Sequence, residues 1–206
     1  MHSIVTQHNC NTNVNMNDCD EIEPYFEENV CGDGYEGIPD YPSSHTLKIK
    51  CGKTDINTVL DNASDRTVCT MECYKKLPTH KILYNGTETH KKVKVRTMGG
   101  LSSVSVFKIV IALNTKSNEI IKLKVHVLNS VTMPRHLKPE SFNVQSAWPT
   151  LDKQIVKEIE QNQISKAELI IGMDNYYKIV TGKMIIHSDE NYAAIHTKYG
   201  WSIGAT

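Results

Sequence analysis

Leu169-Ile170-Ile171-Gly172-Met173-Asp174 is the stretch of this 206-residue sequence that says most about its fold. Three aliphatic residues followed by a glycine are typical of a short buried strand that ends in a turn. Two further stretches belong with it by their order along the chain. Upstream, Val59-Leu60-Asp61 delivers a carboxylate after an apolar pair, and downstream comes Thr197-Lys198-Tyr199-Gly200-Trp201.

A β-hairpin is predicted immediately before Asp61. Leu47 and Ile49 alternate with lysines at the period of a strand, and Gly52-Lys53 suits a turn. A second apolar strand then covers 56–60, so the hairpin ends on the aspartate.

The rest of the chain shows a mixture of strand and helix patterns, with strands prevailing. The predicted elements are a short helix at 70–77 stopped by Pro78, strands at 104–113 and 120–128 joined by a loop at 114–118, a helix opened by Pro149-Thr150 with Asp152 in its first turn and an apolar stripe (Leu151, Ile155, Val156, Ile159), a buried strand at 169–171, a turn or short helix at 175–180, and closing strands at 183–186 and 193–196.

The charge distribution divides the chain in two. Residues 1–45 contain nine acidic residues and no Lys or Arg, which leaves 23 basic against 14 acidic residues for 46–206, a net charge of +9. Because an acidic, Asn-rich stretch with few aliphatic residues buries little apolar surface, we expect a disordered tail at 1–44 and one folded domain at 45–206.

No apolar run reaches the ~18 residues of a membrane span. The first twenty residues are polar where a secretory signal has its apolar core. We therefore expect a soluble, intracellular and cytoplasmic chain without membrane contact. In that setting the six cysteines are interpreted as free thiols, and Cys69 and Cys73 as buried or half-buried small apolar residues.

Taken together, the three quoted stretches resemble the aspartic peptidase domain of BEL/Pao-type retrotransposon polyproteins. The resemblance covers the chain from about His45 to its last residue. It implies a mainly β, retropepsin-like closed β-barrel or sandwich with one short packing helix. It also implies a homodimer, an extended polypeptide as substrate, and no cofactor or metal.

The resemblance gives Asp61 the catalytic role. An aspartic peptidase needs two carboxylates that share one proton, so that one activates water while the other protonates the scissile carbonyl. Because each subunit gives one aspartate, the second must come from another copy through a two-fold axis. Ile170, Ile171 and Gly172 correspond to residues that pack beneath the catalytic loop, and Trp201 to a packing anchor.

The hairpin tip Met98-Gly99-Gly100 corresponds to the flap that closes over a bound peptide in that family. From the two glycines alone, an ordinary turn is the preferred interpretation. Its position between the Asp61 strand and the Ile170-Ile171-Gly172 stretch is what favours a flap.

The loop after the aspartate departs from the family pattern. Asp-Ser-Gly or Asp-Thr-Gly is usual, whereas this chain reads Asp61-Asn62-Ala63-Ser64. Asn62 keeps a hydrogen-bonding side chain, but Ala63 adds a methyl group where room is expected to be short. The alternative is therefore a catalytically inactive relic of the fold, kept as a dimerisation or peptide-binding module.

Other chemistries have less support. The nine histidines include no His-x-x-x-His pair on a predicted helix, so a metal hydrolase is not indicated. Ser64 and Ser105 lack the glycine pattern of a nucleophile elbow. Solvated strand faces explain the surplus lysines more simply than a nucleic-acid partner.

Overall fold

The computed structural model describes residues 44–87, 90–97, 100–129, 142–188 and 190–205. The tail predicted at 1–44 lies outside these ranges except for Ser44, as do Met98 and Gly99 of the predicted flap. The first described strand begins at His45.

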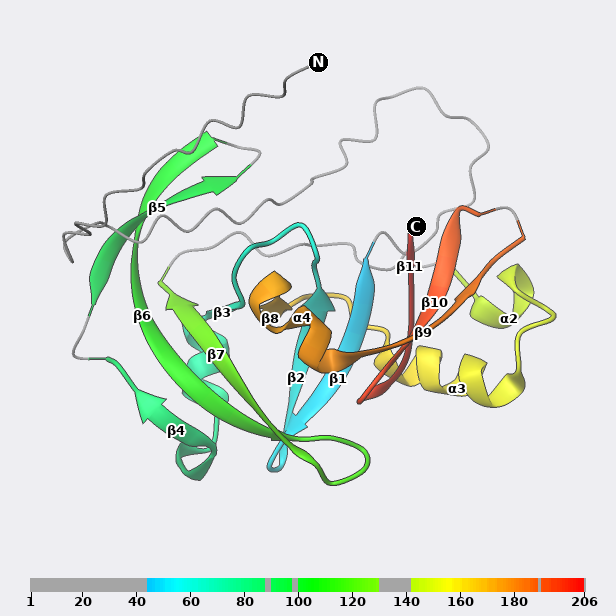
Figure 1. Cartoon of the computed structure of the whole chain (residues 1–206), viewed down its shortest axis with the longest axis horizontal. Helices are drawn as coiled ribbons and strands as arrows, with labels where there is room; N and C mark the ends of the chain where they lie inside the picture. Colours follow the sequence, from blue (N-terminus) through cyan, green and yellow to red (C-terminus); the bar gives the residue numbers. More distant parts are fainter. Residues whose placement is uncertain (1–43, 88–89, 98–99, 130–141, 189, 206) are drawn as a thin grey trace, which may run out of the picture.

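The largest sheet in the described part of the chain is a curled eight-stranded one (Figure 1). Its strands are β1 (His45–Cys51), β2 (Thr54–Leu60), β3 (Val68–Thr70), β4 (Ile82–Asn85), β5 (Lys91–Thr97), β6 (Gly100–Asn114), β7 (Ile120–Leu128) and β8 (Leu169–Ile171). They lie in the order β1-β2-β8-β3-β7-β6-β4, with β5 paired to the first half of β6. Among the described strands β1, β4 and β5 each pair on one side only, so the predicted closure into a barrel is not seen.

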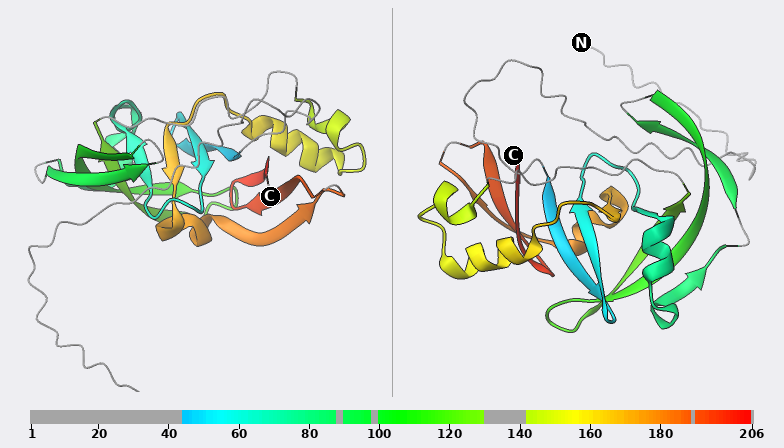
Figure 2. Two further views of the ribbon diagram at one scale, coloured as in Figure 1. Left: turned by 90° about the horizontal axis from the view of Figure 1, so that it is seen from above. Right: turned by 180° about the vertical axis from the view of Figure 1, so that it is seen from behind.

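The last three strands form a second sheet, β11-β10-β9. They are β9 (Val180–Ile186), β10 (Tyr192–Thr197) and β11 (Gly200–Ala205). The strands predicted at 183–186 and 193–196 are present within β9 and β10, and they pair with one another and with β11 rather than with the large sheet. Figure 2 shows this small sheet with a helix across one face.

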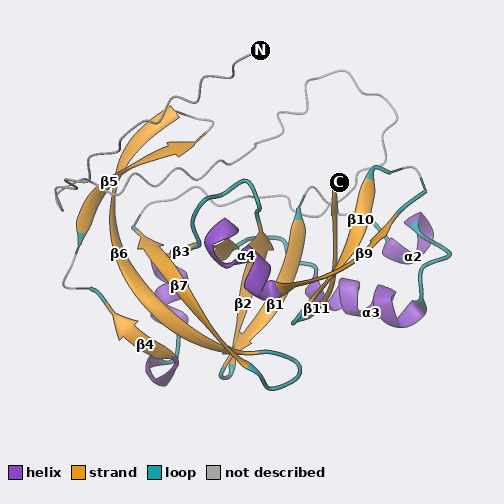
Figure 3. Ribbon diagram, in the orientation of Figure 1, coloured by secondary structure: helices purple, strands orange, loops and turns teal. Residues whose placement is uncertain are grey.

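Four α-helices are described, rather than the single packing helix that the resemblance implied (Figure 3). They are α1 (Met71–Lys76), α2 (Val144–Ala147), α3 (Lys153–Asn162) and α4 (Met173–Ile179), with a 3-10 turn η1 (Thr79–Lys81) after α1. None of the described helices has the length and apolar character needed to cross a membrane.

Helices α1 and α3 each begin at a residue whose side chain caps the first turn. Thr70 Oγ1 accepts from the N–H of Cys73 at the start of α1, as expected for an N-cap. Asp152 Oδ1 accepts from the N–H groups of Gln154 and Ile155. Asp152 is therefore the N-cap of α3, one residue before the first turn in which the sequence had placed it.

Apolar side chains form three clusters. The largest packs α1 and α4 against β1, β2, β6, β7 and β8, a second covers the other face of the large sheet, and the third joins α2 and α3 to β10 and β11. Cys51, Cys69 and Cys73 are buried free thiols in the first cluster. Cys69 lies on β3 and Cys73 on α1, and both are buried, as the sequence predicted.

Candidate functional site

Asp61 follows the last residue of β2, at the end of the large sheet where β8 also ends. Its N–H donates to the carbonyl of Ile171 over 3.0 Å. Its Oδ1 accepts from the N–H groups of Ala63 and Ser64 at 2.9 and 3.2 Å. These bonds hold the half-buried carboxylate of Asp61 at the start of the loop 61–67.

Gly172 lies directly against that loop. A methyl group added at its Cα would meet the carbonyl oxygens of Arg66 and Ser64 at 2.5 and 2.7 Å. The backbone at Gly172 has φ −85° and ψ −179°, which any residue adopts. Glycine is therefore required here by space, because the loop that follows the aspartate passes over it.

Thr67 is the centre of a buried hydrogen-bond network under the same loop. Its hydroxyl donates to Asp174 Oδ1 over 2.6 Å. It accepts from the N–H of Gly172 at 3.2 Å and from the side-chain amide of Asn175 at 2.9 Å. Asn175 also donates to the carbonyl of Lys124, so the network ties the loop to α4 and β7.

Thr67 was not predicted as a site residue from the sequence. Asp174 was part of the quoted Leu169–Asp174 stretch, but no role was assigned to it or to Asn175. The one usable signal was Asp174, two residues after Gly172 and in the first turn of α4, since a carboxylate at the start of a helix favours backbone N–H partners. Here it accepts from the N–H of Thr67 over 2.9 Å, across more than a hundred residues of sequence.

The predicted loop residues divide by their exposure. Asn62 and Ala63 are exposed, so within one chain the methyl group of Ala63 meets no shortage of room. Ser64 is buried. Its hydroxyl donates to the carbonyl of Arg66 and its own carbonyl accepts from Met173, which makes Ser64 part of the loop's support.

The predicted hairpin is present as β5 and β6, with Thr97 and Gly100 as its last described pair. Met98 and Gly99 at its tip lie outside the described residues. Val93 and Val95 of β5 are buried in the same cluster as Val59 of β2. The hairpin and the strand that carries Asp61 thus contribute side chains to one apolar cluster.

His126 on β7 contacts the end of the 61–67 loop at Thr67. Its backbone N–H donates to the carbonyl of Thr67 over 2.9 Å, and its ring Nδ1 lies 3.4 Å from the same oxygen. Burial lowers the pKa of His126, and the nearby charges of Lys108 and Arg66 lower it further. The imidazole is therefore held neutral near pH 7.

The Thr197–Trp201 stretch forms the turn between β10 and β11. Thr197 Oγ1 donates to the carbonyl of Gly200, whose φ is +109°. Trp201 is tied to α3, because its N–H donates to Glu158 and its carbonyl accepts from Asn162. The predicted structural role of this stretch is confirmed.

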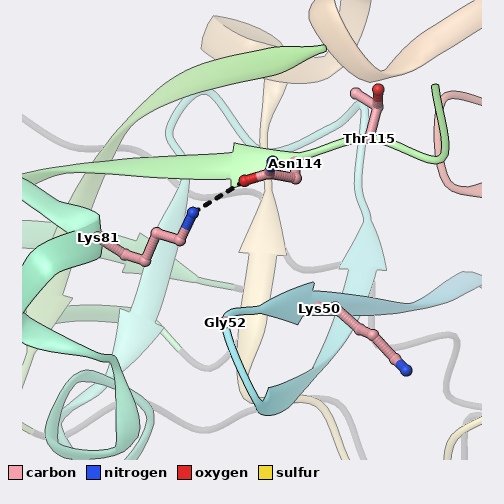
Figure 4. A pocket seen from close by; sticks show the side chains of 5 residues that line it. All are labelled: Lys50, Gly52, Lys81, Asn114 and Thr115. Carbon is pink, nitrogen blue, oxygen red and sulfur yellow. Dashed lines mark hydrogen bonds between the residues drawn. The ribbon is translucent and has the colours of Figure 1, made fainter. Parts of the chain in front are cut away.

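A hollow of about 370 Å³ lies away from Asp61, at the turn end of the β1–β2 hairpin. It is lined by Lys50, Gly52, Lys81, Asn114 and Thr115. Lys81 Nζ donates to Asn114 Oδ1 over 2.9 Å, while Lys50 points away (Figure 4). The described residues contain no cluster of three or more His, Cys, Asp or Glu side chains suited to a metal.

Comparisons with known proteins do not assign the chain to a family. No protein family model matches the chain, and no curated protein matches it. Among solved structures, it is similar to the retroviral protease-like domain of Ddi1 from Leishmania major, with a TM-score of 0.33 and 8% sequence identity over 80% of this chain and 94% of that one. At this level of likeness, fold and activity must be argued from the chain's own residues.

Proposed function

We propose that this chain is one half of a retropepsin-like aspartic endopeptidase of the type found in BEL/Pao retrotransposon polyproteins. Asp61 holds and activates the attacking water together with the Asp61 of a second copy. The substrate is an extended polypeptide, bound as an added strand through its main chain.

This proposal rests on the close contact between the backbone of the Asp61 loop and Gly172. The two stretches that first suggested the family are far apart in sequence, yet Asp61 bonds to Ile171 and the loop passes over Gly172 without room for a methyl group. A buried network then fixes the loop from below. Such a rigid support is what a catalytic carboxylate needs, because small displacements lower rates steeply.

The chemistry requires the second copy. One carboxylate must act as base while another acts as acid, and their closeness keeps a single proton on the pair. Asn62 and Ala63 are exposed at the mouth of the loop, where a partner loop would be met across a two-fold axis.

The second candidate is a catalytically silent member of the same fold that binds peptides or a second copy. The Asp61-Asn62-Ala63 sequence favours it, because the hydroxyl and glycine usual after the aspartate are both absent. In that case the loop is a retained structural element and Asp61 a capping carboxylate for its own loop.

Cleavage of an unfolded polypeptide at mildly acidic pH separates the two candidates. For the peptidase, Asp61→Asn should reduce cleavage by at least ~100-fold, since the group moves a proton in the transition state. Asp65→Asn is the matched control, because it removes the same charge from an exposed position of the same loop and should leave cleavage unchanged. Equal, negligible cleavage by all three proteins would identify the silent relic.

Sedimentation gives a second, independent readout. The peptidase must form a particle of about twice the 23.2 kDa of one chain. A strict monomer at the concentration of an active assay would contradict the shared site, because one chain supplies one carboxylate to it.

A further inference from the structure

One face of the large sheet can be followed strand by strand from β2 to β6. Directly paired residues project to the same face. The register gives the pairs Val59 with Ile170, Ile170 with Val68, Val68 with His126, and His126 with Lys108. The strand that ends on Asp61 therefore shares this face with Lys108, across five strands.

Cationic side chains continue this face toward the Asp61 end. Because side chains alternate along a strand, Lys124 and Lys122 lie on the same face of β7 as His126. Arg66 lies in the bend before β3, close enough to His126 for its charge to lower the pKa of the imidazole. Arg66, Lys122 and Lys124 are all exposed. The carboxylates on the same loop and helix are Asp61, which accepts from the N–H groups of its own loop, Asp65, which is exposed, and Asp174, which is engaged by Thr67. The face is thus predominantly cationic.

The acidic end of the chain joins the fold beside this face. His45 is paired with Leu60, so the residue that precedes β1 leaves the sheet next to Asp61. Asp40 and Asp33 lie five and twelve residues before His45. An extended chain spans about 3.3 Å per residue, which gives these carboxylates a reach of about 17 to 40 Å.

That reach matches the distance to the cationic face. The order β1-β2-β8-β3-β7 places β7 four strands from β1. At about 4.8 Å per strand, the separation is about 19 Å. The segment between Asp33 and Asp40 can therefore lie across the ends of these strands without strain.

We propose that the acidic segment 18–40 of this chain binds across the cationic face formed by Arg66, Lys122 and Lys124, beside the Asp61 loop. The segment carries nine carboxylates and no Lys or Arg, against a net charge of +9 on 46–206. Single exposed ion pairs are weak, but a covalently attached partner binds at a high effective concentration, so several pairs act together. This binding does not depend on catalytic activity. If the chain has the proposed peptidase function, the bound segment competes with the polypeptide substrate.

Digestion of the full chain by a glutamate-specific protease tests this binding, because the segment contains Glu21, Glu23, Glu27, Glu28 and Glu36. In the variant with Lys122→Glu and Lys124→Glu, digestion within the segment should be several-fold faster than in the unchanged protein. The variant with Lys122→Arg and Lys124→Arg keeps the charge and should keep the protection. High salt should abolish the protection, since it screens exposed charges.

The matched control is Lys153→Glu with Lys157→Glu on α3, which alters net charge equally at exposed positions. Its segment should be digested at the original rate, and circular dichroism should show all variants folded. Equal digestion rates in the two Glu variants would overturn the proposal. So would protection that grows with protein concentration, because the occupant would then be the segment of a second copy.

Discussion

Gly172 occupies a place where even one methyl group meets backbone atoms. The atoms nearest to an added Cβ are the carbonyl groups of Arg66 and Ser64, at 2.5 to 2.7 Å. Backbone atoms held in a hydrogen-bonded loop cannot swing aside as a flexible side chain can. Gly172→Ala should therefore lower the free energy of unfolding by about 3 kcal/mol or more, at the upper end of what overpacking costs, measured by urea unfolding.

Gly182 provides the comparison at the same scale. Nothing lies within 4 Å of a Cβ built there, but its φ is +83°. Gly182→Ala should cost about 1 kcal/mol, through backbone conformation alone. A Gly172→Ala variant as stable as Gly182→Ala would show that the Asp61 loop does not press on Gly172.

At the scale of elements, Thr67 couples β3, α4 and β7. Its buried hydroxyl serves Asp174, Gly172 and Asn175 at once. Thr67→Val keeps the shape but removes the hydroxyl, so the N–H of Gly172 loses its partner, while Asp174 keeps the N–H of Thr67 and Asn175 keeps the carbonyl of Lys124. Each buried unsatisfied group costs about 1–3 kcal/mol. We expect a loss of about 3 kcal/mol in the free energy of unfolding.

Thr67→Ser is the matched control, since it keeps the hydroxyl and removes one methyl group. It should cost about 1 kcal/mol. If Ser and Val proved equally destabilising in urea unfolding, packing rather than hydrogen bonding would hold these elements together.

The elements that the sequence predicted are those with strong local patterns. Alternation along 46–60 and 104–128 predicted β1, β2, β6 and β7, and the position before Pro78 predicted α1. The second sheet was missed as a separate unit, because strand patterns do not specify pairing partners. Thr67 was missed for a related reason: a lone threonine becomes a network centre only through residues distant in sequence.

The candidate site was likewise predictable in part. Asp61 and Gly172 stand out because an apolar strand ends at each of them, and the structure brings them to the same loop. Register relations across five strands, which define the cationic face, arise only from the assembled sheet.

At the scale of the whole molecule, the two sheets meet where β11 passes the start of β1. A Cβ added at Gly204 would lie 2.7 Å from the backbone nitrogen of His45. The Nδ1 atom of His45 is buried without a hydrogen-bond partner within the described residues. Burial at this junction lowers the pKa of His45 to about 4, although a hydrogen bond involving the Ser202 backbone opposes the shift.

This shift links the stability of the junction to pH. Between pH 6.5 and about 4, the His45 imidazole is protonated in the unfolded state but neutral in the folded state. The stabilisation present above pH 6.5 is therefore lost as the pH falls. Lowering pH from 7 to 5 should cost about 2 kcal/mol through this residue. His45→Gln should reduce the pH dependence of urea unfolding by that amount, and His80→Gln, on an exposed turn, should not. An unchanged slope in His45→Gln would mean that the histidine is solvated at the junction.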